Sequence, residues 1–358
     1  MNFTEKKILT QLELKKSIPI ITEEDLIHIL SMDIPINLVK DNELINVQNL
    51  ISCQSISILR GRINSLYIIT KLVNLERLSL VGDYIKDISS LQNMQKVKYL
   101  NLSENLIKNI SALSSFTELI ELDLNVNQIC DILPISKLPN LTLLSVSRNK
   151  LTIIKALSQC TKLITLMING NQISDISPVS NLVNLKSLDF SFNKVSDIKP
   201  LRQLRNLESL QMMNNNIIDL YPLKPLQQLG NIQSFNNSII SVWPLIDLLN
   251  IRYLGLDDNK IVNIELMENH DFYYGYCSIS NQLVPSQSEL LFSQKLDLIY
   301  KTNETKVQLY SKINQNKLQF KLYNNMQQVQ MHRTQLSNKH NYIIQLFFQF
   351  ITSGLADQ

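Results

Sequence analysis

An asparagine recurs at every twenty-second position through the middle of the chain. The column opens with Asp83 and then holds asparagine, without a slip of register, at Asn105, Asn127, Asn149, Asn171, Asn193, Asn215, Asn237 and Asn259. Two columns of aliphatic residues keep the same step, one running from Ile85 to Ile261 and the other from Ile88 to Ile264. A fixed period of this length indicates a repeat architecture, in which each unit packs only against its neighbours.

Each 22-residue unit can be written LxxLxLxxNxIxxIxxLxxLxx. Apolar residues at alternate positions before the asparagine, such as Leu100 and Leu102, predict a short strand with one buried face. One unit alone cannot bury that face, so the units are expected to stack into a curved parallel sheet over a continuous core. Turn residues such as Asp131 and Pro134 recur after the asparagine, and the roughly 11 residues left for the return path favour a 3₁₀ or extended segment.

The asparagine column is expected to lie inside the bend that follows each strand. An amide side chain carries both a donor and an acceptor, so it can bridge backbone groups of its own turn and of the next turn. The column therefore predicts a hydrogen-bonded ladder along the stack. Removing one of its side chains should cost about 1–3 kcal/mol, because buried backbone groups lose their partners. Ser145, on the outward side of a predicted strand, is expected to be energetically neutral by comparison.

The unit resembles the 22-residue class of leucine-rich repeats. The run from Asn171 to Leu185, NQISDISPVSNLVNL, is closely similar to the repeats of bacterial internalins, and equally to those of the regulatory subunit of protein phosphatase 1. The resemblance covers residues 31–265. It implies that the concave face of the sheet binds a protein, with a phosphatase catalytic subunit as one candidate partner. Internalins would add a secretion signal and a cell-wall anchor, and neither is apparent here.

The expected fold is an α/β solenoid with helical ends. Residues 1–30, where Thr22 to Asp25 resemble a helix N-terminus, are interpreted as a helical N-terminal cap, and residues 31–265 as the leucine-rich-repeat solenoid. Residues 266–285 are interpreted as a C-terminal cap or linker, and residues 286–358 as an α-helical tail. A series of mostly apolar residues from Leu322 to Phe350, with Arg333 and His340 among them, follows steps of four and three, which is typical of a coiled coil. A hairpin within one chain and pairing between chains both remain open, and a monomer is favoured.

The composition gives little support to an enzyme, a cofactor site or a metal site. Glycine occurs only 7 times in 358 residues, and no phosphate-binding loop is apparent. The 4 histidines form no metal-binding motif, and the 4 cysteines include no CxxC pair. A net charge of +3 does not suggest a nucleic-acid or membrane-surface protein, and no apolar run approaches the roughly 20 residues of a membrane span. A cytoplasmic location is expected, with the nucleus as the alternative.

Side chains between the buried leucines of each strand should point outward, onto the concave face. These outward positions mix small polar residues with a few large apolar and acidic ones. The candidate protein-binding residues are Tyr99, Glu121, Asp123, Asn125, Arg148, Met167, Asn169, Asp189, Phe192, Gln211, Met213, Gln233, Phe235, Tyr253 and Asp257. Acids outnumber bases on this face, which argues against nucleic acid as its ligand.

Three large apolar residues of consecutive units, Phe192, Met213 and Phe235, are expected to touch across the concave face as a binding hot spot. An alternative concerns Phe235. Ser234 occupies a column that is apolar in the other complete units, so a one-residue bulge could turn Phe235 inward to fill that position. The sequence leaves both orientations open.

These patterns favour a non-enzymatic protein-interaction scaffold or regulatory subunit that binds its partner on the concave face. A ribonucleoprotein assembly factor of the spliceosomal A-prime type is the alternative, and an enzyme is the least favoured interpretation. The repeated residues are the structural ones, so they do not identify the partner, the pathway or the oligomeric state.

Overall fold

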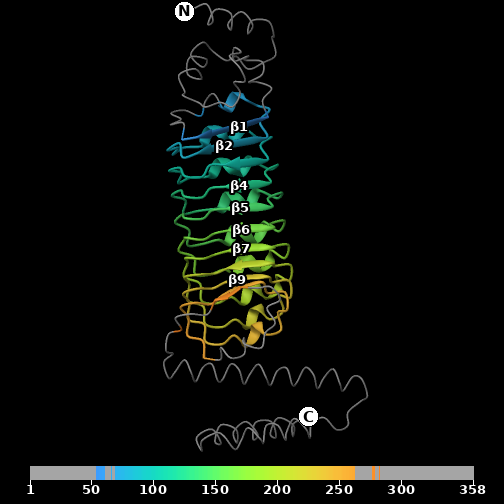
Figure 1. Ribbon diagram of the computed structural model, residues 1–358. Coiled ribbons are helices and arrows are strands. Elements are labelled where there is room, and N and C mark those ends of the chain that lie inside the picture. Colours follow the sequence, from blue (N-terminus) through green and yellow to red (C-terminus); the bar gives the residue numbers. More distant parts are fainter. Residues whose placement is uncertain (1–53, 61–65, 67–68, 263–275, 279–281, 283–358) are drawn as a thin grey trace, which may run out of the picture. The chain divides into compact units, whose positions relative to one another are not determined.

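The computed structural model describes residues 54–60, 66, 69–262, 276–278 and 282 (Figure 1). The chain divides into two compact parts, and all of these residues belong to the first, Met1–Gln294. The predicted N-terminal cap, residues 1–30, and the predicted helical tail, residues 286–358, lie outside the described residues. So does most of the predicted cap or linker at 266–285.

One parallel sheet runs through the described chain, with its 11 strands in sequence order (Figure 1). The strands are β1 (Ser55–Leu59), β2 (Arg77–Val81), β3 (Tyr99–Asn101), β4 (Glu121–Asp123), β5 (Leu143–Ser145), β6 (Thr165–Met167), β7 (Ser187–Asp189), β8 (Ser209–Gln211), β9 (Asn231–Gln233), β10 (Tyr253–Gly255) and β11 (Tyr276–Ser278). Leu78, Leu100 and Leu122 lie in register on neighbouring strands, as the repeat step requires. β11 pairs with β10 one residue later than that step, with Cys277 opposite Leu254.

The return path of the units is built from 3₁₀-helices. They are η1 (Ile69–Lys71), η2 (Ser89–Asn93), η3 (Ser111–Ser115), η4 (Leu133–Lys137), η5 (Lys155–Gln159), η6 (Ser177–Asn181), η7 (Lys199–Gln203), η8 (Tyr221–Leu223) and η9 (Trp243–Leu245). An aspartate precedes many of them, and Asp131 shows its role, because its Oδ1 accepts the Leu133 N–H at 2.8 Å. Pro134 then occupies the first turn of η4, where no backbone N–H is needed.

The predicted 3₁₀ return is thereby confirmed. The α component of the expected α/β class does not occur among the described residues, where every helix is of the 3₁₀ type. The physical reason is length, because the short return path leaves room for one tight turn and its connections.

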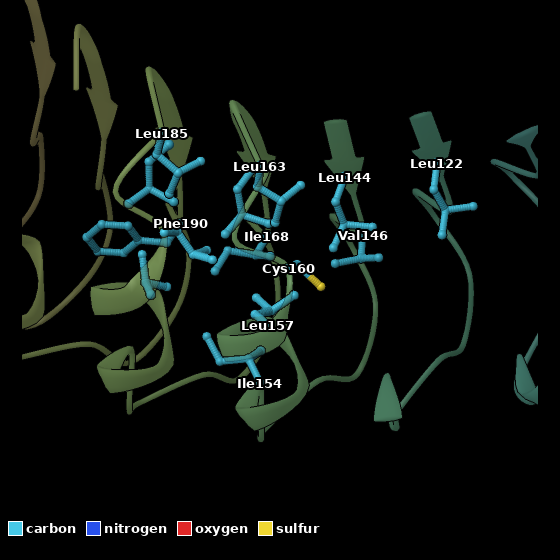
Figure 2. Close-up of a cluster of buried hydrophobic side chains, with 14 of the residues drawn as sticks. Leu122, Leu144, Val146, Ile154, Leu157, Cys160, Leu163, Ile168, Leu185 and Phe190 are labelled. Atoms are coloured by element: carbon cyan, nitrogen blue, oxygen red, sulfur yellow. The ribbon is translucent and has the colours of Figure 1, made fainter. Parts of the chain in front are cut away.

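The core lies between the sheet and the 3₁₀-helices. Each unit contributes residues from the strand and the position after it, such as Leu144 and Val146, and return-path residues such as Ile154 and Leu157, all buried (Figure 2). Cys160 lies in the same core, and burial raises the pKa of its thiol to about 11. The thiol therefore serves as a small apolar group rather than as a nucleophile, as its place in the repeat pattern predicts.

The asparagine column forms the predicted ladder inside the bends. Oδ1 of Asn171 accepts the Leu151 N–H at 2.9 Å, and its Nδ2 donates to the carbonyls of Val146 and Ile168, both at 3.0 Å. The same contacts recur along the column, from Asn105 to Asn259.

Each ladder side chain bridges its own turn to the turn of the preceding unit, whereas the bridge expected from the sequence ran to the following one. Hydrogen bonds between parallel strands are slanted, and the direction of that slant is not visible in the repeat pattern.

A glutamine continues the ladder past the last asparagine. Gln282 comes 23 residues after Asn259, one more than the repeat step. Its Oε1 accepts the Ile261 N–H at 3.0 Å, and its Nε2 donates to the Leu256 carbonyl at 3.1 Å. The longer side chain therefore satisfies the equivalent two backbone groups after the extra residue between β10 and β11.

We expect Asn171→Ala to lower the free energy of unfolding by about 1–3 kcal/mol, because buried backbone groups lose their partner. Asn181→Ala is the matched control: this side chain is exposed at the end of η6 and makes no hydrogen bond among the described residues, so the change should stay within about ±0.5 kcal/mol. Urea unfolding followed by the fluorescence of Trp243, the single tryptophan of the chain, measures both effects. Equal shifts of the two midpoints would contradict the structural role of the ladder.

Candidate protein-binding face

The outward side of the sheet carries the predicted binding residues. In β7, Leu188 is buried and its two neighbours, Ser187 and Asp189, are partly exposed, and this alternation recurs along the sheet. The first outward column holds Tyr99, Glu121 and Tyr253; the second holds Asp123, Met167, Asp189, Gln211 and Gln233; the third holds Asn125, Asn169, Met213, Phe235 and Asp257; and the fourth, at the rim, holds Arg148 and Phe192. Each of these residues keeps part of its surface exposed, and their role in binding stays a prediction.

A left-handed backbone conformation marks the rim column in every unit. Positive φ angles between 52° and 74° occur at Arg60, Gly82, Glu104, Val126, Arg148, Gly170, Phe192, Asn214, Asn236 and Asp258. Glycine, asparagine and aspartate tolerate this conformation best, and their recurrence in one column is the sequence signal that reveals it. Phe192 is a bulky exception, held there by the hydrogen bond from its N–H to the Met213 carbonyl at 2.7 Å. Phe192 keeps 54% of its surface exposed.

Two glycines of the rim make room for arginine side chains of the preceding unit. A Cβ at Gly82 would lie 2.9 Å from the Cγ of Arg60, and a Cβ at Gly170 would lie 3.2 Å from the Cγ of Arg148. Arg60 reaches across its glycine to the carboxylate of Glu104, with 3.2 Å between Nη2 and Oε2. The first carbons of each arginine side chain therefore run along the rim, over the next unit, rather than straight out from the face.

Phe235 lies on the concave face, and the alternative inward orientation is wrong. Ser234 occupies the inward column, where it is fully buried and its Oγ donates to the Gly255 carbonyl at 3.2 Å. A serine whose hydroxyl is satisfied in this way needs no apolar replacement, so no bulge forms. The Phe235 ring covers Gly255 on the next strand, because a Cβ at that glycine would overlap the ring. The ring is thus directed towards β10.

Asp123 and Asp189 are half-buried acids in the second column. Oδ1 of each accepts a backbone N–H two residues on, from Asn125 and from Ser191 respectively, both at 2.9 Å. Burial has the largest effect on both groups and raises the pKa of each carboxyl, while these hydrogen bonds act in the opposite direction. Both carboxylates are therefore held in fixed orientations at some cost in hydration.

The strands beside these acids offer them no positive charge. Met167 and Gln211 lie in register with Asp189, on β6 and β8. Within the described ranges, neither Asp123 nor Asp189 takes part in an ion pair. On the concave face, Asp123 and Asp189 thus present negative charges that have no ion-pair partner among the described residues.

Ser145 departs from the expectation of a neutral surface position. It points outward, but only 3% of its surface is exposed. Its Oγ donates to Oδ1 of Asn125 at 2.7 Å, and the same oxygen accepts the Ser147 N–H at 2.6 Å. A neighbouring unit covers the side chain, and Ser145→Ala would remove its hydrogen bond to Asn125. The effect of this change on stability stays a prediction.

The described residues contain no group of three His, Cys, Asp or Glu side chains placed to hold a metal ion. The same residues include no helix with the length and apolar character needed to cross a membrane.

Known proteins share this repeat geometry. The family model for leucine-rich repeats (2 copies) matches residues 139–181 and 183–225. An internalin of Listeria monocytogenes, InlF, is 30% identical with a TM-score of 0.59, and the match covers 68% of this chain and 78% of that one. This chain belongs to the leucine-rich-repeat family. The internalin-like character of its repeats, expected from the run that begins at Asn171, is thereby confirmed.

Two further leucine-rich-repeat structures resemble the chain. The functional domain of InlJ from L. monocytogenes is 26% identical with a TM-score of 0.54, and the match covers 62% of this chain and 48% of that one. The ectodomain of the plant receptor kinase GASSHO1/SCHENGEN3 from Arabidopsis thaliana is 22% identical with a TM-score of 0.50, covering 58% and 26% respectively, and shares the fold. No curated protein sequence matches this leucine-rich-repeat chain.

Phe235→Ala should leave the leucine-rich-repeat solenoid nearly as stable as before, with a loss of no more than about 1 kcal/mol, because its ring packs on the surface. Phe190→Ala, at a fully buried position, should lower the free energy of unfolding by about 3–5 kcal/mol. Urea unfolding followed by circular dichroism compares the two. A loss of several kcal/mol for Phe235→Ala would show that its ring belongs to the core.

Replacing Asp189 with asparagine should leave stability at neutral pH unchanged or higher. Folding raises the pKa of this carboxyl above its ordinary value of 3.8, so its ionised form costs stability above the raised pKa. That cost disappears as the pH falls towards the ordinary value. Asparagine keeps an oxygen for the Ser191 N–H and carries no charge. We expect the urea midpoint of Asp189→Asn to equal or exceed that of the wild type near pH 7, and any gain to vanish near pH 4. A lower midpoint near pH 7 would show that the charge supports folding.

Proposed function

We propose that this chain is a non-enzymatic protein-binding scaffold whose concave face holds the partner. The observation that carries the proposal is the combination of exposed apolar side chains and half-buried acids on one sheet face. Met167 and Phe192 keep 38% and 54% of their surface exposed, and Met167 lies in register with Asp189. Apolar surface interspersed with charge is the usual anatomy of a protein-binding site.

The division of labour within the repeat supports binding rather than chemistry. The inward columns are filled mostly by apolar side chains and the bends by the asparagine ladder, so the outward columns are free to differ between units. A leucine-rich-repeat ectodomain of the same fold, that of GASSHO1/SCHENGEN3, has been crystallised in complex with CASPARIAN STRIP INTEGRITY FACTOR 2. The fold can therefore serve as a binding platform, and we propose that use for this chain.

Charge favours a protein partner over a nucleic acid. From β3 to β10, the acids of the outward and rim columns are Glu104, Glu121, Asp123, Asp189, Asp257 and Asp258. The bases of the face are few, and Arg77 already lies over the Tyr99 ring, 3.5 Å from its centroid. A phosphate backbone laid on this face would meet more repulsion than attraction.

Crosslinked affinity purification with the full-length chain tests the proposal. We expect the Met167→Ala/Phe192→Ala variant to lose the partners that the wild type retains, because such truncations at a hot spot cost more than about 1 kcal/mol each. Leu133→Ala/Ile153→Ala is the matched control, since these apolar residues are 65% and 71% exposed outside the concave face. Mass spectrometry identifies the retained proteins.

Two outcomes would contradict the proposal. Retention of the same proteins by the concave-face variant would place the binding surface elsewhere. Recovery of RNA as the main crosslinked species would favour the ribonucleoprotein assembly role instead. Recovery of a phosphatase catalytic subunit would narrow the scaffold to a phosphatase regulatory subunit.

A further inference from the structure

The second column of the concave face holds two acids at a defined separation. Asp123, Ser145, Met167 and Asp189 lie in register on β4, β5, β6 and β7. Neighbouring strands are about 4.8 Å apart, so three strand steps separate the two aspartates by about 14 Å. Both carboxylates are held by backbone N–H groups, so the sheet sets their separation.

Each carboxylate lies among uncharged neighbours in register. Asn101 and Ser145 lie beside Asp123, and Met167 lies beside Asp189. Neither acid has an ion-pair partner in the part of the chain that the structure describes. Half-buried carboxylates accept charge-assisted hydrogen bonds, which are stronger than neutral ones, and a cationic donor would offset the hydration that burial removes.

Between the two acids the surface suits an apolar side chain. The Ser145 hydroxyl is already bonded to Asn125 at 2.7 Å, so it needs no further partner. Met167, on the next strand, keeps 38% of its surface exposed, and its thioether adapts to irregular apolar shapes. Phe192 adds an exposed ring at the rim of the following unit. An apolar group placed here would bury surface without leaving these polar groups unpaired.

We propose that the concave face binds an extended polypeptide segment that carries two basic side chains four residues apart and an apolar side chain midway between them. An extended chain rises about 3.3 Å per residue, so residues i and i+4 are about 13 Å apart and lie on the same side as residue i+2. The basic side chains reach Asp123 and Asp189, and the apolar one packs on Met167. This inference rests on the proposed protein-binding function and adds the chemistry of the partner.

A library of random heptapeptides displayed on phage, selected against the full-length chain, tests the inference. We expect retained peptides to be enriched in Lys or Arg at positions i and i+4, with an apolar residue at i+2. The Asp123→Asn/Asp189→Asn variant should retain them about tenfold less, because it keeps the shape of the face and removes its charge. Glu118→Gln is the matched control, since this exposed acid precedes β4 and lies outside the concave columns.

Synthetic peptides then test the spacing itself. Ala-Lys-Ala-Leu-Ala-Lys-Ala should bind about tenfold more tightly than its isomer Ala-Lys-Lys-Leu-Ala-Ala-Ala, which has the same charge in adjacent positions. The difference should shrink as salt concentration rises. Trp243 fluorescence in urea confirms that each variant is folded before its binding is compared.

The outcomes separate this inference from the function on which it rests. If the retained peptides lack paired basic residues but are not retained by Met167→Ala/Phe192→Ala, the proposed charge spacing is wrong. Binding on the concave face would still stand in that case. Peptides retained equally by all variants would overturn both. A selection that enriches no peptide, or equal affinities of the two isomers, would overturn the proposal of a linear basic segment.

Discussion

The side-chain amides of the asparagine ladder are the interaction on which the rest of the structure depends. A bend that follows every strand buries backbone groups that the bend itself cannot satisfy. The Asn171 side chain meets this need because it accepts a backbone N–H from the preceding unit and donates to one carbonyl of that unit and to one carbonyl of its own unit. One side chain therefore satisfies backbone groups of two neighbouring bends. The requirement fixes the repeat length, because the amide reaches both sets of groups only if the units stay in register. Gln282 follows the same rule, since the unit that is one residue longer carries the side chain that is one methylene longer.

Register set by the ladder turns the outward side of the sheet into a regular grid. Positions that differ by one repeat lie on neighbouring strands about 4.8 Å apart, so residues that are distant in sequence become neighbours on the face. The left-handed rim column keeps the same turn in each unit, even where Phe192 must adopt a conformation that bulky side chains avoid. The two glycines of that column, Gly82 and Gly170, stand where an arginine of the preceding unit crosses it. The fold therefore restricts which residues can occupy the inward and bend positions, whereas residue types differ from unit to unit at the outward positions.

Several features of the concave face cost stability. Burial raises the pKa of Asp123 and Asp189, so their charges are held where hydration is poor. Phe192 combines an unfavourable backbone angle with an exposed ring. The continuous aliphatic core and the ladder can carry these costs, because each unit is stabilised by both of its neighbours. Asp123, Asp189 and Phe192 lie between β4 and the rim that follows β7, on the face that we propose binds the partner.

Spacing along the chain determined the repeat step, the alternation of the strands, the ladder and the 3₁₀ return, because each depends on which residues recur at which interval. It also placed Met167 and Asp189 on the outward side. Only the tertiary structure decided which neighbour each side chain meets. Phe235 lies over Gly255 on the next strand, and Ser145 points outward yet is covered. The ladder runs to the preceding unit, and a further strand, β11, joins the sheet after the period has ended. These outcomes depend on contacts between units, where the slant of the hydrogen bonds and the size of a side chain one repeat away choose among arrangements that the same periodic pattern allows.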